Sequence, residues 1–525
     1  MDYIIDFKEI VEQAPAEEPA RQYYFMDRVR ELVEMKKQEG YAAHCMVEVM
    51  GCQMSAKDGE KLLGILERCG YTVTEDDRDA DVVLFTTCTV RENANMKLYG
   101  RVGRLKHQYE RRDGMIIGIT GCMMQEKDEV EGIRKRYPYV RLVFGTHNVY
   151  KLAELLYQTL VTGKRTFEVL EDTKLIVEEL PSDRRYRFKG AVNISYGCNN
   201  FCTYCIVPYV RGREKSRNAT AILRECEQLI ADGCLEITLL GQNVNSYGND
   251  IPGSTSFPEL LAAVAELPGL RRVRYMTSNP KDLSDELIEV MKTHPNIERH
   301  IHLPLQSGSS AILKRMNRHY TKESYLALVE KIRRELPEVA LTTDIIVGFP
   351  GETEADFQDT VEVVQQAQFD AAYTFIYSKR TGTPAASYEQ VPEEDVKDRF
   401  ARLLKIVQES SAANETRDLG KTMEVLVEDE NKNQEGYLTG RLSNSVLVHF
   451  PGPKELIGTM QMVKLTESKG FYYFGELVDG VGPMQRAGTH IPALRCVKGG
   501  RQMCALACGA QAAKGNRWLR KSCRR

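Results

Sequence analysis

The chain has 525 residues, of which 42% are hydrophobic and 28% charged, a balance typical of a folded protein with more than one domain. The net charge is −3, but residues 481–525 hold ten Lys or Arg and no acidic residue, so the remainder of the chain carries −13. A uniformly basic surface for nucleic acid is therefore excluded on that remainder. No apolar run reaches 18 residues and no signal pattern starts the chain, so we expect a cytoplasmic protein without a membrane span. The 14 cysteines then favour metal or redox chemistry over disulfides.

Residues 1–45 show no pattern of chemistry. We expect an extension that is partly disordered, because Glu12–Pro19 is rich in Pro, Ala and Glu. Apolar residues recur at helical spacing over Tyr24–Lys37, which predicts one helix there. Cys45 has no partner at ligand spacing, and we interpret it as a plain thiol.

Residues 46–165 alternate short apolar runs with helical patterns, which predicts an open parallel α/β sheet. The expected strands are Met46–Met50, Asp81–Phe85, Met115–Thr120 and Val140–Phe144. A cysteine follows each of the first three strands, namely Cys52, Cys88 and Cys122. Because ligands bind at the carboxyl edge of such a sheet, these thiolates can converge on a cluster. Position alone favours a cluster and three unrelated buried cysteines equally.

Cys198, Cys202 and Cys205 follow the apolar run Ala191–Tyr196 with the spacing C-x3-C-x2-C. Thiolates at this spacing can hold three irons of a cubane cluster, which leaves the fourth iron open to a ligand that is not protein. The alternatives are a structural zinc site that lacks one ligand and three buried thiols. The spacing favours iron, because zinc pairs usually follow C-x2-C. An open metal position in turn favours chemistry over a structural role.

Residues 185–410 show six strand patterns separated by helical segments, which predicts a partial (β/α)6 barrel with its site at the carboxyl ends of the strands. The expected strands are Ala191–Tyr196, Glu236–Leu240, Arg272–Thr277, His300–Leu305, Leu341–Val347 and Ala372–Tyr377. Polar loops follow four of them, at Gly241–Tyr247, Thr277–Pro280, His302–Gly308 and Asp344–Glu352. Together these loops favour one polar site over ordinary turns. The basic stretch Arg211–Arg217 suits RNA phosphate, a ligand carboxylate or simply a solvated face.

Residues 418–480 contain five short β-like runs, which predict a small β-barrel of a kind that often binds nucleic acid. These runs are Met423–Val427, Leu438–Leu442, Ser445–Phe450, Thr459–Leu465 and Tyr472–Leu477. Residues 481–525 hold four cysteines and ten basic residues without apolar periodicity. We expect this tail to be disordered, with a metal-binding or RNA-binding arm as the alternative.

The cysteine motifs resemble those of a known family. C-x3-C-x2-C after a strand is similar to the radical S-adenosylmethionine (SAM) enzymes, and the segments around Cys52, Cys88 and Cys122 resemble the motifs of the methylthiotransferase N-terminal domain. The last barrel resembles the RNA-binding TRAM domain. The family usually has Asn where this chain has Ser55, and Asn-Thr-Cys where it has Thr86-Thr87-Cys88. These departures keep every cysteine and bear on hydrogen bonds around the ligands.

Membership of the radical SAM methylthiotransferase family implies two [4Fe-4S] clusters and bound SAM. The implied ligands of the radical SAM cluster are Cys198, Cys202 and Cys205, and those of the auxiliary cluster are Cys52, Cys88 and Cys122. The implied SAM contacts are Tyr204, Arg217, Gln242, Asn243, Ser278, Gln306, Asp344 and Gly348. The expected RNA contacts are Arg211, Arg213, Arg441, Asn444 and His449.

The motif Gly241–Tyr247 is similar to the branch that adds a methylthio group to carbon 2 of N6-(dimethylallyl)adenosine beside the tRNA anticodon. The resemblance implies that a 5′-deoxyadenosyl radical removes hydrogen from carbon 2, that the auxiliary cluster supplies sulfur and that a second SAM supplies methyl. No side chain is expected to act as an acid or base, because this carbon–hydrogen bond has no useful acidity. The implied partners of a monomeric enzyme are the tRNA anticodon stem-loop and an electron donor such as flavodoxin or ferredoxin.

Two alternatives stay open. One is a methylthiotransferase that acts on threonylcarbamoyl adenosine or on a ribosomal-protein aspartate, since such enzymes share every cluster ligand. The other is a non-catalytic iron–sulfur protein that binds RNA.

Overall fold

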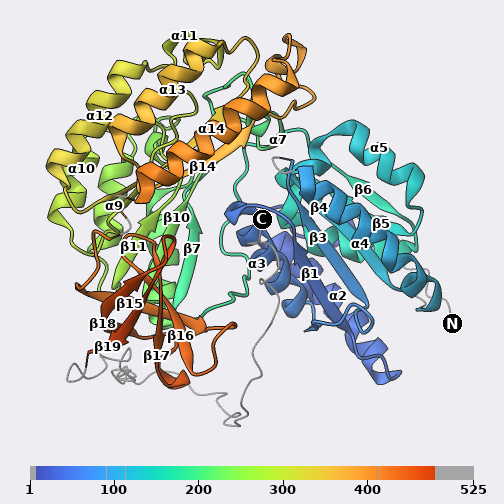
Figure 1. Ribbon diagram of the computed structural model, residues 1–525. Coiled ribbons are helices and arrows are strands. Elements are labelled where there is room, and N and C mark those ends of the chain that lie inside the picture. Colours follow the sequence, from blue (N-terminus) through green and yellow to red (C-terminus); the bar gives the residue numbers. More distant parts are fainter. Residues whose placement is uncertain (1–6, 90–91, 113, 413, 415, 479–525) are drawn as a thin grey trace.

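The computed structural model describes residues 7–89, 92–112, 114–412, 414 and 416–478, which form three domains in chain order (Figure 1). The tail predicted at 481–525 lies outside the described residues. In the described ranges, no helix has both the length and the apolar character that a membrane span requires.

The first domain is a parallel sheet of six strands in the order β2-β1-β3-β4-β5-β6. The strands are His44–Val49 (β1), Thr72–Val73 (β2), Val82–Thr87 (β3), Ile116–Gly121 (β4), Val140–Phe144 (β5) and Thr166–Glu168 (β6). The helices are Gln53–Arg68 (α3), Glu92–Arg111 (α4), Cys122–Gln125 (η1), Lys127–Arg136 (α5), Thr146–Lys151 (η2) and Leu152–Thr162 (α6). Separate hydrophobic clusters cover the two faces, so β3 and β4 are buried along their whole length.

The segment before the first strand belongs to this domain, which corrects the expectation of an extension. Two helices form there, Phe7–Gln13 (α1) and Ala20–Gln38 (α2), and α2 contains the predicted helix. Phe25, Met26 and Val29 of α2 are fully buried and pack in one cluster with residues of α3 and α6. Because burial of large apolar side chains stabilises the helix that carries them, composition alone underestimates the order of this segment.

The central domain is a partial barrel of two parallel sheets, ordered β11-β10-β7 and β12-β13-β14. All six predicted strands are present: Lys189–Asn193 (β7), Glu236–Leu240 (β10), Arg272–Tyr275 (β11), His300–His302 (β12), Ala340–Val347 (β13) and Ala371–Ile376 (β14). A short antiparallel pair, Ser195–Tyr196 (β8) and Lys215–Ser216 (β9), follows β7.

Helices cover the outside of this barrel (Figure 1). The helices of this domain are Val207–Val210 (α7), Ala219–Ala231 (α8), Val244–Ser246 (η3), Phe257–Ala265 (α9), Asp285–Thr293 (α10), Ser310–Arg315 (α11), Lys322–Glu335 (α12), Glu354–Ala367 (α13), Pro384–Ser387 (η4) and Glu393–Ala412 (α14). Alternate strand residues such as Ile237, Leu239 and Val273 pack against these helices in one large core.

The third domain is a closed barrel in the order β15-β16-β17-β19-β18, as the five β-like runs predict. Its elements are Thr422–Glu430 (β15), Tyr437–Leu442 (β16), Leu447–Pro451 (β17), Lys454–Leu456 (η5), Met460–Ser468 (β18) and Tyr472–Leu477 (β19). Closure leaves no free sheet edge along this barrel.

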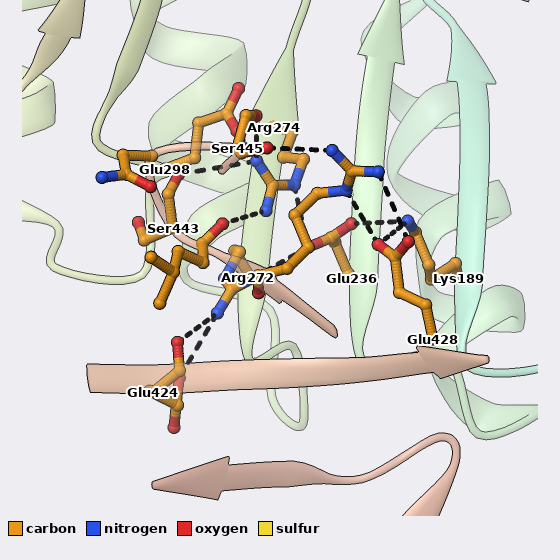
Figure 2. Close-up of polar contacts among 12 residues, drawn as sticks. Lys189, Glu236, Arg272, Arg274, Glu298, Glu424, Glu428, Ser443 and Ser445 are labelled. Atoms are coloured by element: carbon orange, nitrogen blue, oxygen red, sulfur yellow. Dashed lines mark hydrogen bonds and ion pairs between the residues drawn. The ribbon is translucent and has the colours of Figure 1, made fainter. Parts of the chain in front are cut away.

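A buried ion-pair network joins the third domain to the central barrel (Figure 2). Glu236 of β10 is fully buried, and its carboxylate lies 2.8 Å from Arg274 Nε and 3.2 Å from Arg272 Nη1. Lys189 lies 3.4 Å from the same carboxylate and 2.6 Å from Glu428 of β15. Although burial opposes ionisation, these three cations hold the pKa of Glu236 at about 2. The third domain therefore covers the amino ends of these strands and leaves their carboxyl ends for chemistry.

Candidate functional site

Cys198, Cys202 and Cys205, called here the loop trio, lie on one loop at the carboxyl end of β7. The pairing of β8 with β9 closes the base of this loop. Gly197 has a φ of +76°, and a side chain there would overlap carbonyl oxygens of the returning chain. Glycine therefore lets the chain turn directly before Cys198.

The last residue of α11 and the segment that follows it hold this loop in shape. Thr203 Oγ1 donates to the carbonyl of Arg315 at 2.9 Å, and Asn317 Nδ2 donates to the carbonyl of Phe201 at 3.0 Å. Arg318 Nη1 donates to Cys202 Sγ at 3.3 Å. The other contacts of this guanidinium are neutral oxygens, and among the described residues no carboxylate pairs with it. An uncompensated positive charge thus faces the loop trio.

Cys52, Cys88 and Cys122, called here the strand-end trio, lie at the carboxyl ends of β1, β3 and β4. Cys52 is the N-cap residue of α3, Cys88 directly follows β3, and Cys122 begins η1. Gly121 has a φ of +104°, and a side chain there would press on the backbone of Thr87. Because the three strands are neighbours in a parallel sheet, they deliver the three sulfurs to one edge.

Burial and mutual proximity shape both trios. Burial raises the pKa of Cys122 to about 11, with Arg211 acting against this rise and the other two cysteines of the trio adding to it. Burial also raises the pKa of Cys205 to about 12, and the neighbouring thiols of its trio contribute. Within the part of the chain that the structure describes, no three His, Cys, Asp or Glu side chains gather tightly enough for one metal ion. A cubane cluster binds its thiolates through different irons and so suits a wider arrangement than zinc does.

Both trios border α7, at the joint between the first and central domains. Helix α7 lies at this joint (Figure 1), and Ile206 and Val210 pack against Cys122. Arg211 directly follows α7, where its Nε donates to Cys122 Sγ at 3.3 Å and its Nη2 to Asp58 Oδ2 at 2.9 Å. Arg211 is only 5% exposed. The expectation that it contacts RNA is wrong, because its guanidinium is bound inside the protein.

Buried polar atoms without partners line the carboxyl ends of β7, β10 and β11. They are Asn193 Oδ1, Ser195 Oγ, Gln242 Oε1, Asn243 Oδ1 and Ser278 Oγ. Because buried polar atoms rarely stay unpaired, this row fits a polar ligand that lies across the strand ends. Three of the residues predicted to contact SAM belong to the row.

Two other residues predicted to contact SAM have different roles. Arg217 is buried, and it forms ion pairs with Glu178 and with Glu225, the latter at 2.8 Å, so its charge is already neutralised. This corrects its assignment to a ligand carboxylate. Gly348 has a φ of +74°, and its missing side chain faces Val396 of α14. Glycine is needed there for helix packing.

The remaining three lie around the same edge. Gln306 has a φ of +68° and bridges to β13, and Asp344 of β13 accepts from His302 Nε2 at 3.3 Å. The ring of Tyr204 packs edge-on against Phe349, with 6.4 Å between ring centroids. Their contact with SAM stays a prediction.

The expected RNA contacts of the third domain are mostly internal. Arg441 Nε donates to Glu428 Oε1 at 2.9 Å, and Asn444 Nδ2 donates to Asp418 Oδ2 at 3.0 Å. Asn444 is 4% exposed, so it serves the barrel and not a ligand. This burial corrects the assignment of Asn444. Arg441 pairs with a carboxylate but keeps 31% of its side chain exposed, so its RNA contact stays a prediction. His449 lies 4.8 Å from the ring of Tyr472, and its RNA contact stays a prediction.

Arg213 is the exposed arginine among the candidates near the loop trio. Its guanidinium lies 4.7 Å from the centre of the Phe201 ring, and the ring of Tyr209 meets Phe201 edge-on at 6.1 Å. Tyr209 is 47% exposed. Sequence analysis missed the two aromatic residues, although the position of Phe201 inside the cysteine motif could have drawn attention to it.

Tyr373 and Phe375 of β14 were also missed. They are 56% and 50% exposed, unusual values for large apolar side chains on a strand. In register they lie beside Asp344 and Ile346, which alternate with core residues of β13. They therefore point away from the helix-covered face and toward the interior of the partial barrel. The alternation of side chains along a strand did not predict that these two residues face the barrel interior, because both faces of β14 carry apolar residues.

Three family models match the chain. The first, an uncharacterized protein family termed UPF0004, matches residues 44–145. The radical SAM superfamily matches residues 192–364, and the TRAM domain matches residues 417–478. These ranges fall in the three structural domains in the same order.

Curated relatives match over nearly their whole length. A protein of Lachnoclostridium phytofermentans named tRNA-2-methylthio-N(6)-dimethylallyladenosine synthase is 56% identical over 434 residues, which are 82% of this chain and 95% of the relative. A protein of the same name from Clostridium tetani is 51% identical and covers 82% of this chain and 96% of the relative. Among solved structures, the cobalamin-dependent radical SAM enzyme OxsB has a TM-score of 0.46 and 12% identity, and covers 71% of this chain and 57% of that one. A likeness of this size does not bear on activity.

Enzymes of this kind use [4Fe-4S] clusters and SAM. The residues present fit both groups, since one trio of thiols shares a single loop, the other shares one sheet edge, and a row of unpaired polar atoms lies at the strand ends beside the loop. The domains, their order and the identity to full-length relatives agree. The chain belongs to the radical SAM methylthiotransferase family, among enzymes named tRNA-2-methylthio-N(6)-dimethylallyladenosine synthases.

Proposed function

We propose that the chain adds a methylthio group to carbon 2 of N6-(dimethylallyl)adenosine beside the anticodon of tRNA. Identity of 56% to a relative of that name supports the substrate, and the TRAM domain supports RNA binding. The observation that carries the proposal is the joint between the first two domains, where both cysteine trios border α7. A reaction that draws on two clusters needs both of them within reach of one substrate.

The loop trio would hold the radical SAM cluster, and the strand-end trio would hold the auxiliary one. When bound, the clusters and SAM supply the radical, the sulfur and the methyl group. Asn193, Gln242 and Ser278 would orient SAM, because their buried polar atoms lack other partners. No side chain is assigned as acid or base, since the carbon–hydrogen bond of the adenine ring offers no useful acidity.

The anticodon loop would approach the group formed by Phe201, Tyr209 and Arg213. In the described residues Arg213 has no carboxylate partner, so its charge is available to a phosphate. The two aromatic rings offer stacking surfaces for unpaired bases. The target adenine would leave the stack and pass Tyr373 and Phe375, whose exposed rings suit its prenyl group.

The loop trio would receive its electron from a small carrier such as flavodoxin or ferredoxin. We place the enzyme in the cytoplasm and as a monomer, in keeping with tRNA as the substrate. Size-exclusion chromatography with light scattering checks the oligomeric state, and reduction by each purified carrier checks the donor.

The activity test is an anaerobic reaction of reconstituted enzyme with SAM, reductant and tRNA that carries N6-(dimethylallyl)adenosine. Mass spectrometry of the nucleosides should show the methylthio product only when the prenyl group is present. Product from threonylcarbamoyl adenosine or from ribosomal protein, without product from prenylated tRNA, would move the chain to another branch. Intact RNA affinity without SAM cleavage would leave a non-catalytic iron–sulfur protein.

A further inference from the structure

Arg211 occupies an unusual position for an arginine. Its residue is 5% exposed, its Nε lies 3.3 Å from Cys122 Sγ and its Nη2 lies 2.9 Å from Asp58 Oδ2. Its backbone N–H also donates to the carbonyl of Val207 at 2.8 Å, which fixes the residue to α7. Burial of a guanidinium is costly unless charged or polar partners satisfy it, so these contacts hold Arg211 in one defined position.

The contacts of Arg211 cross between domains. Cys122 and Asp58 belong to the first domain, whereas Arg211 is part of the loop segment of the central domain. Thr146 Oγ1 donates to the carbonyl of Val210 at 2.7 Å and supports the same joint. The strand-end trio thus receives one polar partner that its own domain does not provide.

The loop trio also has an arginine at one of its sulfurs, Arg318, but the charges around that arginine differ. Arg318 contacts Cys202 Sγ at 3.3 Å, the same distance at which Arg211 contacts Cys122. The partners of Arg318 are Tyr320 and Asn279, so its positive charge is uncompensated, whereas Asp58 compensates Arg211. Each trio therefore has one arginine at one sulfur, and the two differ by one nearby carboxylate.

We infer that Arg211 is a positioning residue that completes the strand-end trio from the second domain. Held by Asp58, it fixes the Cys122 sulfur and places a positive charge beside the thiolates, which favours the more negative, reduced form of a bound cluster. Partners around metal ligands usually change metal affinity by about 10- to 100-fold when they are removed. This inference rests on the proposed function only in that the strand-end trio must hold a cluster.

The test uses the full-length chain reconstituted with both clusters, with a full-length C198A/C202A/C205A chain to identify the auxiliary signal. Arg211→Gln should speed chelator-driven loss of auxiliary iron by about 10- to 100-fold and lower the midpoint potential of that cluster in an EPR-monitored titration. Asp58→Asn should raise this potential, because it removes the compensating negative charge. Arg211→Lys should leave the midpoint potential close to its wild-type value, because the positive charge remains. It should still speed iron loss in part, because an ammonium group lacks the forked donors with which a guanidinium contacts Cys122 and Asp58 together.

The midpoint potential should fall in Arg211→Gln and rise in Asp58→Asn. General damage to the fold would give no such opposite shifts, so the pair of variants separates the two explanations. Arg224→Gln is the matched control, because Arg224 is an exposed arginine whose ion pair is with Glu179. It should leave the potential and the iron loss unchanged. Wild-type values for both quantities in Arg211→Gln would overturn the inference. A wild-type chain that never holds auxiliary iron would instead overturn the two-cluster function.

Discussion

The loop trio lies within one loop of the central domain, whereas the strand-end trio is gathered from three strands of the first domain. The loop is shaped locally by Gly197, by the β8–β9 pair and by the segment after α11. The strand-end trio depends on the register of a whole sheet and on Arg211 from another domain. Local damage should therefore disable the loop trio, while the strand-end trio should also respond to changes at the domain joint.

Removal of one cysteine from each trio gives the largest expected contrast. Cys202→Ala should abolish formation of 5′-deoxyadenosine, because only two thiolates remain in the loop. Cys88→Ala should spare SAM cleavage and stop methylthio transfer. One reaction mixture analysed for both products measures the two effects. Normal SAM cleavage by Cys202→Ala would remove the loop trio as the radical site, and normal product from Cys88→Ala would remove the sulfur role of the other trio.

The glycine before a cysteine in each trio offers a second contrast. Gly197→Ala should lose iron from the loop trio and Gly121→Ala from the strand-end trio, because each adds about 1–3 kcal/mol of backbone strain and a steric overlap. Iron analysis and EPR of the two variants measure the selectivity. Gly163→Ala is the control, since Gly163 has a φ of +65° but open space around it. Equal loss from all three variants would refute the local explanation.

Mild acid should affect the joint before it affects the loop trio. His147 lies in η2 beside Thr146, whose hydroxyl donates to the carbonyl of Val210 at the joint. Burial, together with Lys215, lowers the pKa of His147 to about 4, with Arg211 also acting in this direction and Asp172 against it. The neutral imidazole contributes full stability above its ordinary pKa of 6.5, and this contribution is lost as the pH falls toward 4. The loss is on the order of 3 kcal/mol.

Hydrogen exchange between pH 7 and pH 5 measures this effect. Protection should fall at residues 122–125 and 207–210 and stay unchanged at residues 315–318, which anchor the loop trio. His147→Gln should remove the pH dependence at the joint. Parallel loss of protection at both places would contradict the assignment of the acid response to the joint.

Glu236 provides the smallest expected effect on the two trios. Glu236→Gln breaks a buried pairing with three cations, which should destabilise the junction with the third domain by about 3–5 kcal/mol. Both trios lie at the other end of the strands, so iron content should stay at the wild-type value. Urea unfolding and iron analysis check the two statements, and iron loss in this variant would show that the third domain supports the clusters.

Local patterns predicted most of the fold and the loop trio. The strand runs and the motif C-x3-C-x2-C are contiguous, so residue order alone carries the information. The strand-end trio needed one further step, because parallel strands bring their carboxyl ends to one edge. The expected order of the N-terminal segment was wrong, since the cluster that buries α2 comes from helices far along the chain.

The charged and polar candidates were predicted less well, for one physical reason. Arg211, Arg217, Arg441 and Asn444 look like free donors in the sequence, yet each meets a carboxylate that the fold brings to it. Arg217 meets two, Glu178 and Glu225, so there are five carboxylates in all. Three of the five, Asp58, Glu178 and Asp418, lie more than 20 residues away in the chain and were not predictable from spacing. Arg213, by contrast, is exposed and contacts the face of an aromatic ring.

Anaerobic iron and sulfide content of the reconstituted protein tests the two-cluster account most directly. The samples are the wild type, the C198A/C202A/C205A chain and the C52A/C88A/C122A chain. We predict about eight irons per chain in the wild type and about four in each variant, as two independent cubane clusters require. About four irons in the wild type, lost only when Cys198, Cys202 and Cys205 are changed, would contradict the account and leave the strand-end trio without a cluster.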